Sequence, residues 1–206
     1  MSFFRLFIFS DGTIPNRLIT IILVVFLLIA CNAPANQPVN KSENEAVTFP
    51  DDWKGQWAGE LKIYSYDGLK QSLPMELHIL PIDTSDAWSW TIFYGEDKVK
   101  GKRDYQLIPK DVEKGIYQVD EQNSILLDAY LFDGKLFERF EVMGNLLTTT
   151  TELQGDKLVW EIISGSLSNT ISTGNTVHGG DTIPEVKSYP INMMQRAYLS
   201  KIKNNE

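Results

Sequence analysis

The sequence predicts an all-β protein, a single antiparallel up-and-down barrel of about 8–10 strands. From Trp53 onward, apolar and polar residues alternate, and turn-forming residues recur every eight to twelve positions. No part of this region shows convincing helical periodicity. A meander of this length avoids exposed sheet edges most completely by closing on itself.

The chain begins with the features of a secretory signal peptide. The 13 residues from Leu18 to Ala30 carry no charge, and Arg5 and Arg17 precede them. A membrane-spanning helix needs about 18–20 apolar residues. We therefore expect residues 1–30 to be a cleaved leader.

The end of this leader resembles the bacterial lipobox, with Leu28, Ile29 and Ala30 before Cys31. The resemblance implies that Cys31 receives a diacylglycerol group, that the leader is cut before it, and that the new amine is acylated as well. At least two acyl chains are needed for stable attachment to a membrane. An ordinary secreted or single-span protein with an incidental Cys31 is the alternative. As the only cysteine, Cys31 leaves no internal disulfide framework.

The cleaved chain would have 176 residues, which suits one domain with a full core. With 17 basic and 26 acidic residues, its net charge would be −9, which argues against nucleic acid or anionic lipid as partners. Residues 31–50 are polar, with Pro34 and Pro38, and predict a flexible tether before a barrel domain at 51–206. Asn32 stands where an inner-membrane retention Asp would sit in enterobacterial lipoproteins. This favours the outer membrane of a bacterial envelope.

The first predicted strand, 56–65, places Trp57, Gly59, Leu61 and Ile63 on one face. Asp67-Gly68 then predicts a type I′ hairpin turn, and a helix near 51–54 would be short. The following strands are expected at 73–80, 87–94, 101–108, 115–120, 124–132, 135–142, 146–153, 157–164 and 189–201.

Residues 165–187 depart from this pattern because they are rich in Gly, Ser, Thr and Asn. One interpretation is a long loop, which would be a lid, a binding loop or a disordered segment. The other extends the preceding strand to Thr173 and turns at Gly174-Asn175. Pro190 lies near the start of the last strand, where a missing donor costs least.

Gly55-Gln56-Trp57 at the start of the first strand resembles the Gly-x-Trp of the lipocalins and their calycin relatives. In that family an Arg or Lys late in the last strand packs across the Trp and closes the barrel floor. The resemblance implies a contact between Trp57 and Arg196, worth roughly 0.5–2 kcal/mol. The chain also resembles uncharacterised envelope lipoproteins of Bacteroidetes-type bacteria, which brings no known activity.

Catalytic and metal-binding motifs are absent from the sequence. The two histidines, His78 and His178, lie outside any recognisable motif, and His178-Gly179-Gly180-Asp181 has too few ligands for a metal and more simply marks a turn. The acidic pairs at 51–52 and 120–121 fall at strand ends, where solvated carboxylates are ordinary. We therefore predict no catalytic residue, cofactor or metal. An acid and a base brought together from separate strands stay an open alternative.

The predicted barrel interior offers a tentative ligand site. Polar groups on otherwise apolar faces, beside large aromatic residues, are typical of small-molecule sites. These residues are Trp90, Arg103, Tyr105, Tyr117, Glu138 and Trp160. Alternatively, the polar groups lie in water at the rim, or Arg103 and Glu138 neutralise each other in a filled core.

The sequence thus favours a lipid-anchored envelope lipoprotein that binds a small apolar or amphipathic ligand in its barrel, in the periplasm or at the outer membrane. A structural module of the envelope that binds protein or glycan through its outer face or long loop is the alternative. An enzyme is a third, weaker hypothesis.

Overall fold

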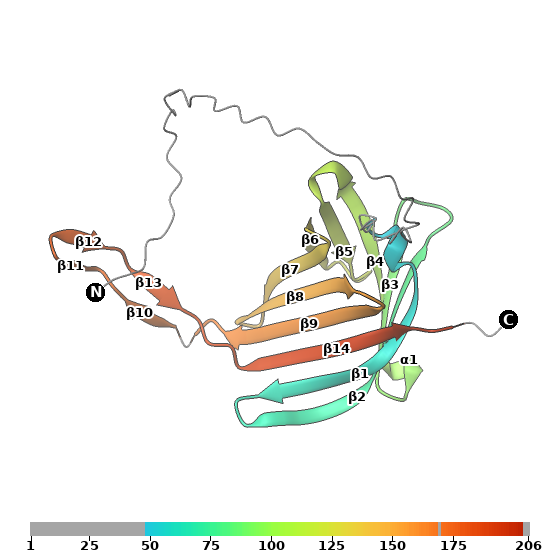
Figure 1. The fold of residues 1–206 in the computed structure, drawn as a ribbon, viewed down its shortest axis with the longest axis horizontal. Helices are drawn as coiled ribbons and strands as arrows, with labels where there is room; N and C mark the ends of the chain where they lie inside the picture. Colours follow the sequence, from blue (N-terminus) through green and yellow to red (C-terminus); the bar gives the residue numbers. More distant parts are fainter. Residues whose placement is uncertain (1–47, 169, 204–206) are drawn as a thin grey trace, which may run out of the picture. The chain divides into compact units, whose positions relative to one another are not determined.

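Ten antiparallel strands close into one barrel in the computed structural model, which describes residues 48–168 and 170–203 (Figure 1). The leader, Cys31 and most of the tether lie outside the described residues. Around the barrel the order is β1-β14-β9-β8-β7-β6-β5-β4-β3-β2. The barrel strands are β1 (Gly55–Ser65), β2 (Gly68–Pro81), β3 (Trp88–Tyr94), β4 (Lys102–Asp111), β5 (Ile116–Asp120), β6 (Leu126–Phe132), β7 (Lys135–Val142), β8 (Asn145–Gln154), β9 (Lys157–Ser166) and β14 (Met193–Lys201).

The predicted all-β barrel is therefore confirmed. Among the described residues, three short helices accompany it: η1 (Asp51–Trp53), α1 (Lys98–Gly101) and η2 (Val112–Lys114). None of the described helices is long and apolar enough to cross a membrane.

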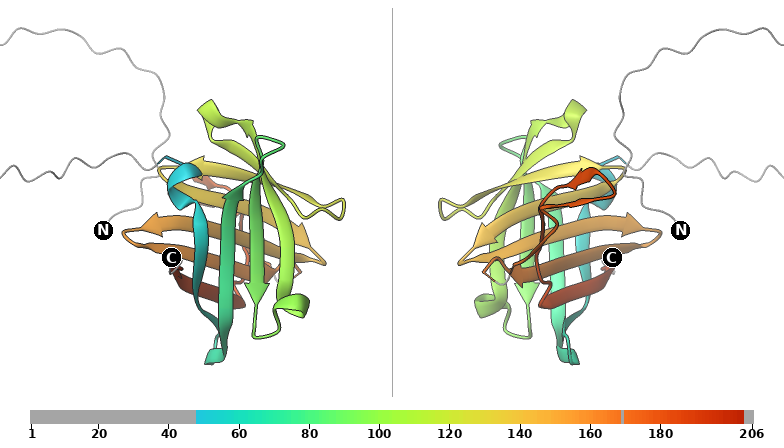
Figure 2. Two further views of the ribbon diagram at one scale, coloured as in Figure 1. Left: turned by 90° about the vertical axis from the view of Figure 1, so that its right-hand side faces the viewer. Right: turned by 90° about the vertical axis from the view of Figure 1, so that its left-hand side faces the viewer.

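Because consecutive strands are antiparallel, the connections fall into two groups at opposite ends of the barrel (Figure 2). The β1–β2, β3–β4, β5–β6, β7–β8 and β9–β14 connections lie at one end, which we call the open end. The segment entering at η1 and the remaining connections lie at the other, which we call the plugged end.

The first hairpin differs from its prediction. Ser65 pairs with Gly68, so the central turn residues are Tyr66 and Asp67. Gly68 follows them with φ +95°. A positive φ only after the turn fits a type I turn followed by a bulge better than the predicted type I′ turn. At β6–β7, by contrast, Asp133 and Gly134 both have positive φ, as a type I′ turn requires.

The barrel interior is mostly apolar because every strand directs alternate side chains inward and most of the inward side chains are hydrophobic. This alternation buries Trp57 and Leu61 on β1, and the other strands contribute similarly. The fully enclosed members of the core include Leu61, Met75, Leu77, Ile79, Leu107, Leu136, Leu158 and Leu199.

The entry segment forms the plug. Phe49 packs edge-on against Trp53, with ring centroids 4.6 Å apart, and against Tyr117 at 4.9 Å. The indole Nε1 of Trp57 donates to the Trp53 carbonyl at 2.8 Å. The segment before the first strand thus fills this end of the barrel with aromatic side chains.

Residues 171–188 form a hairpin in two paired parts, and both interpretations of this region were incomplete (Figure 1). β10 (Ile171–Thr173) pairs with β13 (Val186–Ser188), and β11 (Thr176–His178) pairs with β12 (Asp181–Ile183). The turn lies at Gly179-Gly180, both with positive φ. Gly174-Asn175 only interrupts the pairing, beside Pro184.

Candidate functional site

The barrel contains an inner cavity made of two adjoining spaces. A deep space of about 150 Å³ and an outer space of about 430 Å³ share Tyr94, Trp160 and Ile162 in their walls. The outer space is further lined by residues of the open end, including Gln71, Leu73, Arg103 and Gln195. The cavity therefore extends from the middle of the barrel toward the open end.

Aromatic and aliphatic side chains form most of the deep wall. Tyr94 and Trp160 meet edge to face there, with ring centroids 6.4 Å apart. The apolar lining is Trp90, Ile92, Val119, Leu127, Phe140, Trp160 and Ile162. Five polar-tipped residues complete the wall: Tyr94, Tyr105, Glu121, Glu138 and Thr149.

Glu138 is the most unusual of these residues because it is a carboxyl group that is only 7 % exposed. It faces inward from β7, between Leu136 and Phe140, and its cross-strand neighbours are Ala129 and Thr149. Within the described residues, no hydrogen bond or ion pair of its carboxylate is found, and its oxygens are not wholly enclosed, so they face the cavity. Burial, reinforced by the charge of Glu121, raises the pKa of Glu138 to about 7.

The two tyrosines near Glu138 are perturbed by the same surroundings. Burial is the main cause that raises the pKa of Tyr94 and of Tyr105. The charge of Glu121 adds to the effect on Tyr105, whereas Arg103 opposes it. Both hydroxyls therefore remain protonated donors at neutral pH.

The structure brings together five of the six predicted ligand-site residues. Trp90, Tyr105, Glu138 and Trp160 line the deep space, and Arg103 and Trp160 line the outer one. Tyr117 is buried in the aromatic plug and lines neither space. Its inward direction was predictable from alternation, but the plug that covers it comes from outside the strands.

Arg103 does not neutralise Glu138. It is exposed, and its Nη1 donates to the carbonyls of Lys100 and Lys102 at 3.1 and 2.8 Å. Among the described residues, no ion pair joins it to Glu138. The interior is therefore not filled by an Arg103–Glu138 pair.

Sequence reasoning missed Glu121, Tyr94 and Thr149. Glu121 was interpreted as a solvated turn residue, yet it continues the inward face of Tyr117 and Val119. Tyr94 likewise continues the face of Trp90 and Ile92. Following the period of two to the last residue of the expected strand 87–94 would have found Tyr94, and extending it one residue past 115–120 would have found Glu121.

The predicted contact between Trp57 and Arg196 is wrong. Arg196 pairs in register with Lys62 and lies on the outer face, where it forms an ion pair with Glu161 on β9. The Nζ of Lys201 instead lies 5.3 Å from the centroid of the Trp57 ring. Lys201 is directly opposite Trp57, and side chains on one strand alternate between faces, so Arg196 faces the other way.

Gly55 makes room for this lysine. A Cβ at Gly55 would lie 2.5 Å from Cε of Lys201, and φ at Gly55 is +143°. The stem of Lys201 therefore crosses Gly55 before its ammonium group reaches Trp57. This gives the Gly-x-Trp pattern a physical reason in this chain.

The part of the chain that the structure describes offers few other groups that could bind a metal or catalyse a reaction. Among residues 48–168 and 170–203, no three His, Cys, Asp or Glu side chains are grouped as a metal site would require. His78 lies on the outer face, with Nε2 3.0 Å from Oε2 of Glu76. The other carboxylate oxygen of Glu76 accepts a hydrogen bond from Nζ of Lys98. His178 is in the exposed hairpin.

No family model and no curated protein matches the sequence. Among solved structures, the chain is similar to a protein of unknown function from the DUF3598 family of Nostoc punctiforme, with a TM-score of 0.50 and 15 % identity. The match covers 74 % of this chain and 48 % of the other, so the chain spans about half the length of that protein. At this identity the likeness concerns the fold alone.

Proposed function

We propose that the barrel binds a small apolar or amphipathic molecule in its inner cavity, which the molecule enters through the open end. The observation that carries this proposal is an apolar, aromatic cavity into which a few polar groups converge. Small-molecule sites are commonly built in this way, often in the mouths of β-barrels.

The size of the cavity supports the same conclusion. Ligand sites usually have volumes of roughly 300–1,000 Å³. The outer space alone, at about 430 Å³, falls in that range, and the deep space adjoins it. A ligand could thus place one end among Trp90 and Trp160 and extend toward the open end.

A cavity-filling variant tests the proposal. Ile162 borders both spaces, whereas its neighbour Ile163 lines a pocket on the outer side of the sheet. We expect Ile162→Trp to weaken binding of the neutral fluorophore N-phenyl-1-naphthylamine at least ten-fold. The matched control, Ile163→Trp, should bind like the unmodified protein.

Native mass spectrometry of the purified protein provides a second readout, since a copurifying small molecule would support the proposal. Failure of the unmodified protein to bind the fluorophore, or equal binding by both variants, would overturn it.

The proposed setting is the bacterial envelope, with the protein anchored in the outer membrane through acyl chains on Cys31. The support is the lipobox-like sequence Leu28-Ile29-Ala30-Cys31 and the polar tether after it. When the full chain is expressed in a Gram-negative host, it should partition into detergent and carry the mass of a lipidated N-terminus. Cys31→Ser should remain in the aqueous phase; detergent partition of that variant would contradict the anchor.

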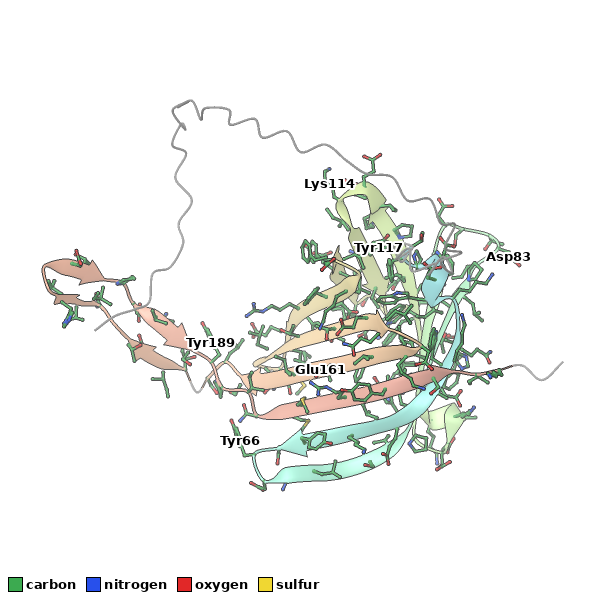
Figure 3. All side chains as sticks on the ribbon, in the orientation of Figure 1. Tyr66, Asp83, Lys114, Tyr117, Glu161 and Tyr189 are labelled. Atoms are coloured by element: carbon green, nitrogen blue, oxygen red, sulfur yellow. The ribbon has the colours of Figure 1, made fainter. Side chains whose placement is uncertain are left out.

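One observation favours a second candidate, a protein- or glycan-binding module of the envelope. The hairpin from β10 to β13 exposes Ile171, Val177 and Val186, each more than half exposed, and Tyr189 lies just beyond it (Figure 3). Crosslinked pull-downs with the hairpin shortened test this role. Unchanged partner recovery would count against it.

A further inference from the structure

We infer that the inner cavity selects ligands that carry a protonated amine at the deep end, where the ammonium group pairs with the carboxylate of Glu138. This inference rests on the proposed ligand-binding function and specifies its ligand class as a cationic amphiphile.

The first support is an unpartnered buried carboxyl group. A buried carboxylate without a partner is costly, and proteins normally pair such charges. Among the described residues, neither cross-strand neighbour of Glu138 is charged, and the guanidinium of Arg103 is engaged with backbone carbonyls. The missing counter-charge must therefore come from the ligand if Glu138 is to be ionised in the complex.

The second support is the negative charge of the side chains that line the deep space. Glu121 and Glu138 both line it, and no Lys or Arg does. A ligand carboxylate placed there would face two like charges, whereas an ammonium group would relieve their repulsion. The charge of the wall thus discriminates against anionic amphiphiles such as fatty acids.

The third support is the aromatic wall. Trp90, Trp160, Tyr94 and Tyr105 surround the same space. The faces of aromatic rings attract cations, and Trp attracts them most strongly. Aromatic rings combined with carboxylates favour an ammonium group over a neutral hydroxyl.

The remaining wall accounts for the ligand's tail. Leu61, Ile63 and Leu73 line the outer space, with Arg103 among the residues that surround it. An alkyl chain fits this lining, and the cationic rim at Arg103 gives the ammonium group no favourable place there. The amine end is consequently directed inward.

The test compares three probes with one tail: dodecylamine, dodecanol and dodecanoate, each below its micellar concentration, by calorimetry and tryptophan fluorescence. At pH 8 we expect dodecylamine to bind at least ten-fold more tightly than the other two. Glu138→Gln should lose at least ten-fold for dodecylamine and little for dodecanol. The control is Glu141→Gln, an exposed position on the outer face of the same strand, which should change nothing.

A pH series on the unmodified protein gives an independent readout. The groups that share the wall with Glu138 are Glu121 from the β5–β6 connection, Tyr105 from β4 and Tyr94 from β3, and Arg103 lines the adjoining outer space. Between pH 8 and 5 the amine and both tyrosines keep their protonation, whereas Glu138 gains a proton. Dodecylamine affinity should therefore fall over this interval and dodecanol affinity should not.

Equal or tighter binding of dodecanoate, or unchanged dodecylamine binding by Glu138→Gln and across the pH series, would overturn the inference while leaving the proposed function in place. If none of the three probes binds, the proposed function fails as well.

Discussion

The ionisation of Glu138 couples stability to pH at the level of a single residue. Its pKa is raised from 4.5 to about 7 in the folded state, so the folded protein binds the extra proton between these values. Stability therefore falls as pH rises from about 4.5 to 7 and is constant in this respect above that. The full effect is about 3 kcal/mol at 1.36 kcal/mol per pKa unit.

Glu138→Gln should remove this contribution in the ligand-free protein. We expect the free energy of unfolding of the variant, relative to that of the unmodified protein, to be about 2–3 kcal/mol higher at pH 8 than at pH 5. Urea denaturation at the two pH values measures the difference. Parallel pH profiles for the two proteins would contradict the assigned burial.

Lys201 over Trp57 is the second residue-scale feature with a measurable effect. Lys201→Ala removes the ammonium group and the stem that packs on Gly55, and should cost about 0.5–1 kcal/mol. Lys203→Ala, an exposed position two residues later, is the control and should be neutral. Chemical denaturation measures the free energy of unfolding of both variants. Equal effects would mean that the contact of Lys201 with Trp57 does not stabilise the barrel.

At the scale of elements, the aromatic plug should contribute strongly to stability. Phe49→Ala removes a ring that is 8 % exposed and contacts Trp53 and Tyr117, so we expect a loss of about 3 kcal/mol. Phe132 on β6 is 61 % exposed, and Phe132→Ala should cost less than about 1 kcal/mol. Urea midpoints give both values; similar losses would mean that the entry segment adds little.

The hairpin, by contrast, should be dispensable for folding. All described residues from Ile171 to Ser188 are exposed. Replacing residues 174–185 with Asn-Gly joins Thr173 to Val186 through a favoured two-residue turn and keeps the β10–β13 pairing. We expect the melting temperature to change by only a few degrees and fluorophore binding to persist. A large drop in either would show that the hairpin supports the barrel.

Alternation allowed the elements to be predicted closely because side chains on a strand change faces with a period of two. The predicted strand at 135–142 matches β7, and inward Glu138 follows from the same pattern. What depends on register could not be predicted. Lys201, and not Arg196, lies over Trp57 because the register between β1 and β14 places Lys201 opposite Trp57. These two strands are far apart in the sequence, and alternation within each strand does not determine their register.

For the site, the sequence identified which side chains enter the barrel but not how deep they lie. Tyr117 and Tyr105 both point inward, yet the plug covers one and the cavity exposes the other. The depth depends on how far a segment outside the strands fills the interior. Alternation carries no information about this.

At the scale of the whole molecule, closure depends on the pairing of the first and last barrel strands. β14 joins β1 on one side and β9 on the other. A chain that ends at residue 192 would leave both of those edges unpaired, and open edges promote aggregation. We expect this truncation to be recovered as aggregate by size-exclusion chromatography, while a chain that ends at residue 203 stays monodisperse. A well-folded truncation would show that closure is optional.

The pairing of β1 with β14 also determines when the barrel can close during the protein's biosynthesis. Trp57 is synthesised well before its partner Lys201. The other barrel strands can pair with their neighbours as synthesis proceeds, yet the barrel wall is incomplete until β14 emerges. Such long-range pairing is slow to form, and the wall of the proposed ligand site is complete only once β14 closes the barrel.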